Sequence, residues 1–351
     1  MKAGLVIRNY PKEKYKAIFD RNSGFFARIE DKTEREPFWA QTGPELLDVS
    51  ITNWCDRECE ICYRDSNRNG IHMTFDDYRF ILQEAASHNV FQIALGGGNP
   101  NQHPQFPEIL EITRRGYGIV PSFTTNGRGL TKDVLEASKE YCGAVAVSAY
   151  EPYIELDVAV EKLVKYEIRT NIHFVLDRYS VDTAIDWLKN GKDILNRCNA
   201  LVFLNYKPVG RNKNRELLAN NNSNLATLFS IIDEHDYSFR IGFDSCSVSG
   251  ILSYMPKTNK TYVEPCEAGR FSAFISENLQ MYPCSFMMGN LRGESLREKP
   301  FMEIWRNSRP FVKIRNKLKS NKCSSCSHQK NCLNGCPFLS EINLCNSILC
   351  N

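Results

Sequence analysis

Six short apolar runs recur along the first two thirds of this chain, and a helix-like stretch separates most of them. The runs cover residues 46–52, 90–96, 119–125, 144–150, 170–176 and 200–206. Apolar runs of this length are typical of strands buried on both faces of a parallel sheet. Helical patterns lie between them, the first beginning at Thr74, an expected N-cap followed by acidic residues. Strands and helices alternating at this spacing predict an α/β fold of βα units, as an open sheet or a barrel.

The chain changes character on either side of this regular part. Residues 1–42 are polar and aromatic, and the segments LVIRNY and GFFARIE predict a small hairpin. After a helical stretch at 223–235 and a strand at 237–243, the remainder has short strands, many turns and most of the later cysteines. We therefore expect an N-terminal extension (1–42), a core domain (43–240) and a cysteine-rich domain (241–351).

Charge and targeting signals restrict the partners of the chain. The net charge of +3 and pI near 8.1 are too mild to indicate nucleic acid or an anionic membrane. The sequence has no apolar segment that resembles a secretory signal or a membrane span. We expect a cytoplasmic protein without nucleic-acid or membrane partners. Thiols stay reduced in that compartment, so the fourteen cysteines need an explanation other than disulfides.

Three cysteines, Cys55, Cys59 and Cys62, directly follow the first predicted strand. Loops at the carboxyl ends of parallel strands are where α/β folds place their sites. Three thiolates in one loop can hold three irons of a 4Fe–4S cluster and leave the fourth iron open to another ligand. Taken alone, the triplet also fits a zinc site completed by a distant ligand, or unliganded thiols.

The triplet and its companions resemble the radical S-adenosylmethionine (SAM) superfamily, whose signature is CxxxCxxC on the first βα loop. The resemblance implies a partial (β/α)6 TIM-like barrel and a catalytic 4Fe–4S cluster that binds SAM at its open iron. It implies a 5′-deoxyadenosyl radical that abstracts a substrate hydrogen, and a reductant such as flavodoxin or ferredoxin. The positions that match the family's SAM-binding elements are Gly96, Gly97, Gly98, Asn99, Asn126, Ser148, Asn171 and Gly210. Asn99 replaces a family glutamate, and Ile61 replaces an aromatic residue that packs on adenine.

A second set of cysteines lies in the tail, with the spacing CxxCx5CxxxC from Cys323 to Cys336. A zinc ribbon is the alternative for this set in isolation. With two cysteines further upstream, the arrangement resembles the SPASM domain, which binds two auxiliary 4Fe–4S clusters. The resemblance implies one or two such clusters. It assigns to the first Cys266, Cys284 and Cys336, and to the second Cys323, Cys326, Cys332 and either Cys345 or Cys350.

The tail departs from the family pattern at two points. Ser272 stands where some members have a further cysteine, which leaves either Cys246 as a substitute or an open iron. Asn278-Leu279 replaces a glycine before the hairpin cysteine, and we expect Asn278 to take the left-handed turn. Cys142 and Cys198 are expected to be buried small apolar residues.

SPASM enzymes mostly modify peptides, and the resemblance therefore implies an oxidative peptide maturase. Ser285 stands where sulfatase-maturing members have an aspartate, which argues against formylglycine formation. The lead of 42 residues is too short for a leader-binding domain, so we expect direct docking or a separate recognition protein. The expected reaction is a thioether or carbon–carbon crosslink in a ribosomally made peptide. The alternatives are a dehydrogenase or epimerase acting on a small molecule, and a zinc-stabilised binding protein.

Overall fold

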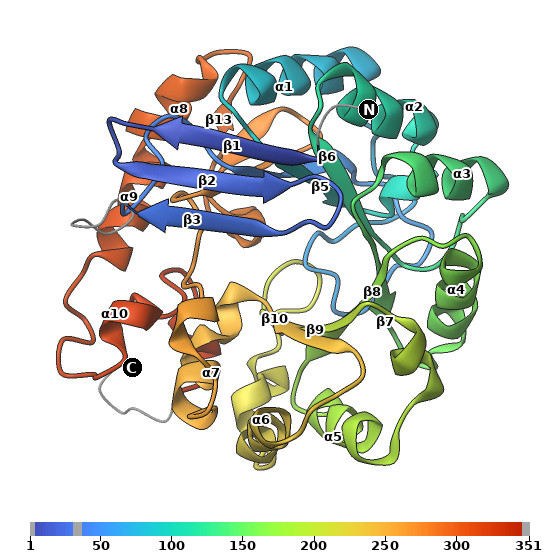
Figure 1. The fold of residues 1–351 in the computed structure, drawn as a ribbon, viewed down its shortest axis with the longest axis vertical. Helices are drawn as coiled ribbons and strands as arrows, with labels where there is room; N and C mark the ends of the chain where they lie inside the picture. The colour runs from blue at the N-terminus through green and yellow to red at the C-terminus, as the bar shows by residue number, and fades with distance from the viewer. Residues whose placement is uncertain (1–3, 31–36, 346–351) are drawn as a thin grey trace.

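The computed structural model describes residues 4–30 and 37–345, and its largest element is one ten-stranded sheet (Figure 1). The strand order is β10-β9-β8-β7-β6-β5-β4-β11-β12-β13, and the neighbours from β10 to β11 run parallel. The regular strands are β4 (Leu46–Thr52), β5 (Gln92–Gly97), β6 (Val120–Thr125), β7 (Val145–Ala149), β8 (Thr170–Leu176), β9 (Ala200–Asn205) and β10 (Arg240–Phe243). The α/β prediction is confirmed. The described sheet is open, with β10 and β13 at its ends.

Six helices follow these strands around the outside of the sheet (Figure 1). They are α1 (Phe75–Ser87), α2 (Phe106–Glu111), α3 (Lys132–Tyr141), α4 (Ile154–Lys165), α5 (Ser180–Asn190) and α6 (Leu225–Glu234). The expected N-cap of α1 is present, because the backbone N–H of Asp77 donates to Thr74 Oγ1 at 3.1 Å. Along β4, the side chain of Leu47 is fully buried in the main core and the alternate residue Asp48 lines a cavity. The strands therefore separate a helix-covered face from a cavity-lining face.

The N-terminal segment forms a separate antiparallel sheet and not the predicted hairpin. Its strands are β1 (Leu5–Tyr10), β2 (Tyr15–Asp20) and β3 (Phe26–Glu30), in the order β1-β2-β3. The prediction that β1 pairs with β3 was wrong, because β2 lies between them. The sheet packs through Tyr15 and Phe19 against Phe91 and Val120 of the core.

The cysteine-rich segment continues the large sheet. Strand β11 (Ser272–Ile275) pairs with β4 in parallel, and the antiparallel strands β12 (Gln280–Tyr282) and β13 (Glu294–Ser295) follow. Its helices are α7 (Val248–Tyr254), α8 (Phe301–Asn307), α9 (Arg309–Leu318) and α10 (Gln329–Cys332). The left-handed residue of the β11–β12 turn is Leu279, with φ of 58°, and not Asn278. The leucine side chain belongs to the main core, and its burial holds this backbone conformation.

Across the described ranges, every helix falls short of the length and apolar character that a bilayer span requires.

Candidate active site and cysteine groups

One cavity of about 340 Å³ lies where β4 to β9 end. Its wall contains Cys55, Cys59 and Cys62, the glycine turn after β5, and the polar ends of β6 and β7. Two residues of the cysteine-rich segment, Ser285 and Phe286, complete the wall. The cavity therefore brings together residues from both parts of the chain, at the edge of the sheet where parallel folds place their sites.

The cysteine loop (residues 55–66) begins three residues after β4 ends. The N–H of Cys62 donates to the carbonyl of Cys59 at 3.2 Å, and the N–H of Ser66 donates to the Cys62 sulfur at 3.4 Å. The amide nitrogen of Asn126 lies 3.7 Å from the Cys55 sulfur. Hydrogen bonds to sulfur are a regular feature of cysteines that hold iron–sulfur clusters.

The turn after β9 contacts the cysteine loop and holds it through hydrogen bonds. Gly210 has φ of 78°, and a Cβ there would overlap the carbonyl oxygens of Cys62 and Tyr63. The guanidinium of Arg211 donates to the carbonyls of Cys59 at 2.7 Å and Ser66 at 2.6 Å, and to the Asp65 carboxylate at 2.8 Å. The lack of a side chain at Gly210 thus allows the turn after β9 to approach the backbone of the cysteine loop closely.

The three glycines after β5 have different surroundings. A Cβ on Gly97 would overlap the carbonyl oxygen of Thr52, and one on Gly98 would overlap that of Trp54. A Cβ on Gly96 would meet nothing within 4 Å and would project into open space. All three glycines line the cavity. The turn therefore packs tightly against the strand that precedes the cysteine loop and leaves its backbone accessible to a ligand.

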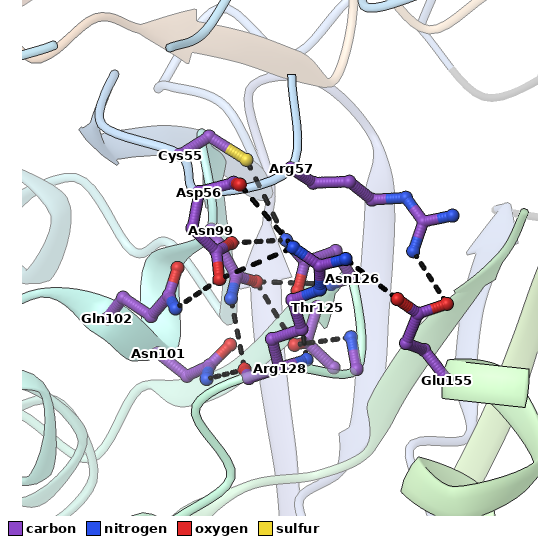
Figure 2. Close-up of polar contacts among 11 residues, drawn as sticks. Cys55, Asp56, Arg57, Asn99, Asn101, Gln102, Thr125, Asn126, Arg128 and Glu155 are labelled. Carbon is purple, nitrogen blue, oxygen red and sulfur yellow. Dashed lines mark hydrogen bonds and ion pairs between the residues drawn. The ribbon is translucent and has the colours of Figure 1, made fainter. Parts of the chain in front are cut away.

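The side chain of Asn99 lies behind this turn, fully buried (Figure 2). Its Oδ1 accepts from the Thr125 hydroxyl at 3.0 Å and the Asn126 N–H at 3.1 Å. Its Nδ2 donates to the carbonyl of Arg128 at 3.1 Å. These bonds join the glycine turn to the turn after β6, so Asn99 positions the neighbouring loop.

Asn126 connects the turn after β6 to the cysteine loop, because its Nδ2 donates to Asp56 Oδ1 at 3.0 Å. Glu155 at the start of α4 pairs with Arg57 at 3.1 Å and Arg128 at 2.7 Å (Figure 2). Hydrogen bonds from these two guanidinium groups lower the pKa of Glu155 to about 2. The carboxylate therefore stays charged and holds the two loops together.

Ser148 lies on the cavity wall, whereas Asn171 lies outside it. The Asn171 Oδ1 accepts from Asn199 Nδ2 at 2.8 Å, near the start of β8. His173, two residues further along the same strand face, lines the cavity and lies 3.3 Å from the Thr124 hydroxyl. Burial lowers the pKa of His173 to about 4, so its imidazole is neutral near pH 7. The sequence reasoning missed His173; the alternation of β8 could have indicated it.

The tail cysteines form two groups. Four of them line one small cavity between α7 and α10, and we call them the outer group: Cys323, Cys326, Cys332 and Cys345. Cys350 lies outside the described residues. The inner group consists of Cys266, Cys284 and Cys336, whose sulfurs accept backbone N–H groups from Ala268, Phe286 and Leu339 respectively. None of the thirteen cysteines in the described ranges forms a disulfide.

Two family models match the chain, one named Radical SAM superfamily over residues 49–202 and one for the SPASM iron–sulfur cluster-binding domain over residues 266–332. The chain belongs to the radical SAM superfamily. This radical SAM enzyme carries a C-terminal SPASM domain and uses SAM together with 4Fe–4S clusters.

The relatives of this enzyme have names that refer to different products. It is 24% identical to the AdoMet-dependent heme synthase of Methanosarcina barkeri, over 84% of this chain and 91% of that protein. It is also 24% identical to the mycofactocin maturase MftC of Mycobacterium tuberculosis, over 84% of this chain and 78% of that one. The crystal structure of SuiB from Streptococcus suis shares the fold, with a TM-score of 0.73 at 15% identity over 100% and 99% of the two chains.

The residues present fit iron–sulfur clusters. A tetrahedral zinc site gathers its ligands around a single ion. Thiolates on a 4Fe–4S cluster each bind a different iron, so they surround a larger volume. The cysteine loop offers three sulfurs beside a cavity, as a cluster with one open iron requires.

The rest of the cavity wall is aromatic and cationic. The rings of Tyr63 and Phe286 lie 4.8 Å apart, and Lys207 lies over the Phe286 ring at 4.5 Å. Lys207 is buried and pairs with Asp244 at 2.5 Å. The pKa of Lys207 is raised by this carboxylate despite the opposing effect of burial. The wall thus carries an ammonium group that Asp244 holds in place.

Proposed function

We propose that this enzyme forms an oxidative crosslink, a thioether or carbon–carbon bond, in a ribosomally made peptide. In this proposal residues 43–240 form the radical SAM core and residues 241–351 the SPASM domain. The observation that carries the proposal is the shared cavity. Its wall joins the cysteine loop to Ser285 and Phe286, the two residues after Cys284. A substrate in the cavity therefore lies between the catalytic thiols and the inner group.

The chain's own residues would bind and orient the reactants. Cys55, Cys59 and Cys62 would hold three irons and leave the fourth for SAM. The polar groups of SAM would lie along the glycine turn (Gly96, Gly97 and Gly98), Asn126 and Ser148. When bound, the cluster supplies the electron that cleaves SAM, and the resulting 5′-deoxyadenosyl radical takes a hydrogen atom from the substrate. The turns that Asn99 and Arg211 fasten would keep that geometry fixed while water is excluded.

A crosslink removes two hydrogens from the substrate. One leaves as an atom, the other leaves as a proton, and one electron remains to be removed. Phe286 borders the cavity, and its N–H donates to the sulfur of Cys284. The inner group therefore lies next to the site where that electron is released. An iron–sulfur cluster can accept it, whereas zinc has no accessible redox change.

The relatives support a peptide substrate. They include mycofactocin maturase and PqqA peptide cyclase, and a structure of SuiB contains its precursor peptide SuiA. We propose that a peptide is the substrate here, delivered by direct docking or by a separate leader-recognition protein. A flavodoxin or ferredoxin would supply the first electron.

The heme synthase relative favours a second candidate, oxidation of a small molecule. The cavity of about 340 Å³ is at the lower end for ligand sites, and SAM must share it with the reacting part of the substrate. A peptide can insert a single side chain, whereas a small substrate must enter whole. The limited volume therefore favours the peptide.

The test uses reconstituted enzyme under anaerobic conditions with SAM, a flavodoxin reducing system and short precursor peptides encoded beside its gene. We expect 5′-deoxyadenosine and a peptide lighter by two hydrogen atoms, in equal amounts. The Cys55→Ala/Cys59→Ala/Cys62→Ala variant is the control and should form neither product. Turnover of a small molecule, with every precursor peptide unchanged, would replace the peptide assignment with the second candidate.

A further inference from the structure

Cys246 lies three residues beyond the end of β10, the strand at one end of the sheet. Cys55 stands at the same distance beyond β4. The 3-10 turn that carries Cys246 (Ser245–Ser247) is fixed by Asp244, which accepts from the Ser247 hydroxyl at 2.9 Å. Asp244 also binds Lys207. The position of this thiol is therefore set by the sheet.

The Cys246 thiol lies among the inner group. It forms a hydrogen bond with the Cys336 thiol, and both pack in the small cluster around Tyr206 and Ile342. Cys246 also lies close enough to Cys266 and Cys284 to interact electrostatically with both thiols. Four thiols from four separate segments of the chain therefore meet at one place, although each of them is more than fifteen residues from its nearest partner in sequence.

This environment differs from that of a structural cysteine. Cys198 is buried and its thiol donates to the carbonyl of Leu195 at 3.2 Å, as a small apolar residue with a weak donor does. Cys246 instead lies among sulfurs: its thiol forms a hydrogen bond with that of Cys336, and the ammonium of Lys207 lies nearby. A cluster of thiols beside a positive charge is the environment of a metal-binding cysteine and not of a packing residue.

Ser272, at the position of the missing family cysteine, has a hydroxyl and so supplies no thiolate. It lies in β11, where it pairs with Leu46 of β4. Without a further ligand, the three sulfurs of the inner group would leave one iron of their cluster open. Cys246 supplies an additional sulfur beside them.

We propose that Cys246 is the fourth thiolate ligand of the first auxiliary cluster, together with Cys266, Cys284 and Cys336. That cluster then has no open iron and does not bind substrate directly, so it serves as an electron acceptor. The inference deepens the proposed function, but the coordination itself requires neither a peptide nor SAM.

The test starts from the Cys55→Ala/Cys59→Ala/Cys62→Ala variant, because its tail clusters are then the only ones present. The reconstituted protein should hold about eight irons, four for each auxiliary cluster. Reduced protein is mixed with ¹³C-cyanide, a ligand for open iron sites, and ¹³C coupling is measured by electron–nuclear double resonance. With Cys246 intact we expect no coupling.

Adding Cys246→Ala should either open one iron to cyanide, which gives a ¹³C coupling, or reduce the iron to about four per chain. Cys246→Ser keeps the size of the side chain and should shift the electron paramagnetic resonance signal of one reduced cluster. Cys198→Ala, a buried thiol outside the group, is the matched control and should change nothing. Circular dichroism checks that each variant is folded.

Three outcomes would overturn the assignment. Cyanide could bind while Cys246 is intact, or the starting variant could hold only about four irons. The Cys246 variants could also leave iron content, resonance signal and cyanide binding unchanged. None of these measurements depends on peptide turnover, so a failure here is distinguishable from a failure of the proposed function.

Discussion

The cysteine loop and the inner group collect their sulfurs in opposite ways. Cys55, Cys59 and Cys62 fall within eight consecutive residues, whereas Cys266, Cys284 and Cys336 span seventy-one. The loop borders an open cavity and offers three sulfurs. In the inner group Cys266 is buried and Cys284 and Cys336 are half-buried, with Cys246 as a fourth neighbouring thiol. A local loop is suited to leave one coordination position open, while an assembled group can surround its cluster completely.

The difference also determines what holds each site in place. The cysteine loop depends on side chains from other turns, chiefly Arg211 and Asn126. The inner group depends on the pairing of β11 with β4 and on backbone N–H groups within its own segments. Substitutions that loosen the loop should therefore spare the tail, and substitutions in the tail should spare SAM cleavage.

The largest effect is expected from the Cys55→Ala/Cys59→Ala/Cys62→Ala variant. It should lose all reductive formation of 5′-deoxyadenosine, because no thiolate remains to hold the catalytic cluster. Its iron content should fall from about twelve to about eight per chain, since the tail clusters remain. Chromatography of the nucleoside and iron analysis measure the two effects. SAM cleavage that persisted in this variant would remove the assigned role from the loop.

Cys326→Ala tests whether the tail can be altered without affecting the cysteine loop. The outer group should lose its cluster and the iron should fall to about eight, while SAM cleavage continues. The crosslinked peptide should not form, because the inner group would have no second cluster to which it could pass the electron. Cys142→Ala is the control for loss of a thiol outside all groups. In the unsubstituted enzyme, an iron content near four per chain together with one equivalent of zinc would instead indicate a structural zinc tail.

The sequence predicted the regular strands well because each is a compact apolar run. The runs at 46–52 and 170–176 coincide with β4 and β8. It did not predict β2, which alternates buried and exposed residues between two aromatic segments. Nor did it predict the pairing of β11 with β4, because residues 272 and 46 are far apart in the chain and no local pattern encodes their contact.

Within the site, the sequence indicated neither which face of a strand lines the cavity nor how deep the cavity reaches. Asn171 and His173 share one face of β8, and only the second lines the cavity, nearer the carboxyl end. The partners of Asn99 were also beyond the sequence, because they come from the turn after β6. The position of Cys246 among the inner sulfurs required the fold for the same reason.

Asp48 lies on the cavity wall near both cysteine regions. Burial, with a smaller contribution from Glu267, raises its pKa from 3.8 to about 6. Below pH 3.8 the carboxyl is protonated in both the folded and the unfolded state. As the pH rises through 6 the folded state must ionise it, so this residue's contribution to stability is lost. Asp48→Asn should therefore raise the free energy of unfolding at pH 8 by about 3 kcal/mol and leave it unchanged near pH 4. Anaerobic thermal unfolding measures this; equal gains at both pH values would show that the cause is not ionisation.

Asn99→Asp tests whether this side chain positions the loops or contacts the SAM amine. The carboxylate would keep the acceptor for Thr125 and Asn126 but face the carbonyl of Arg128, where Nδ2 now donates. We expect a loss of about 2 kcal/mol in stability and weaker SAM binding. Asn316→Asp, the same change at an exposed site, is the control. Tighter SAM binding by Asn99→Asp would instead indicate direct contact with the amine, whereas unchanged binding would show that the side chain does not face it.

Arg211→Lys should give the smallest effect and tests whether the cysteine loop can be loosened separately from the tail. Lysine keeps the charge, but one ammonium cannot reach the carbonyls of Cys59 and Ser66 and the Asp65 carboxylate as the planar guanidinium does. The loss of about 1 kcal/mol corresponds to a roughly fivefold weaker SAM affinity, measured by equilibrium dialysis. Arg215→Lys, at an exposed pair with Glu341, is the matched control and should leave the affinity unchanged. The tail should keep its iron in both variants. A loss of tail iron in Arg211→Lys would show that the two cysteine regions are coupled, and the contrast between a local site and an assembled site would no longer describe this enzyme.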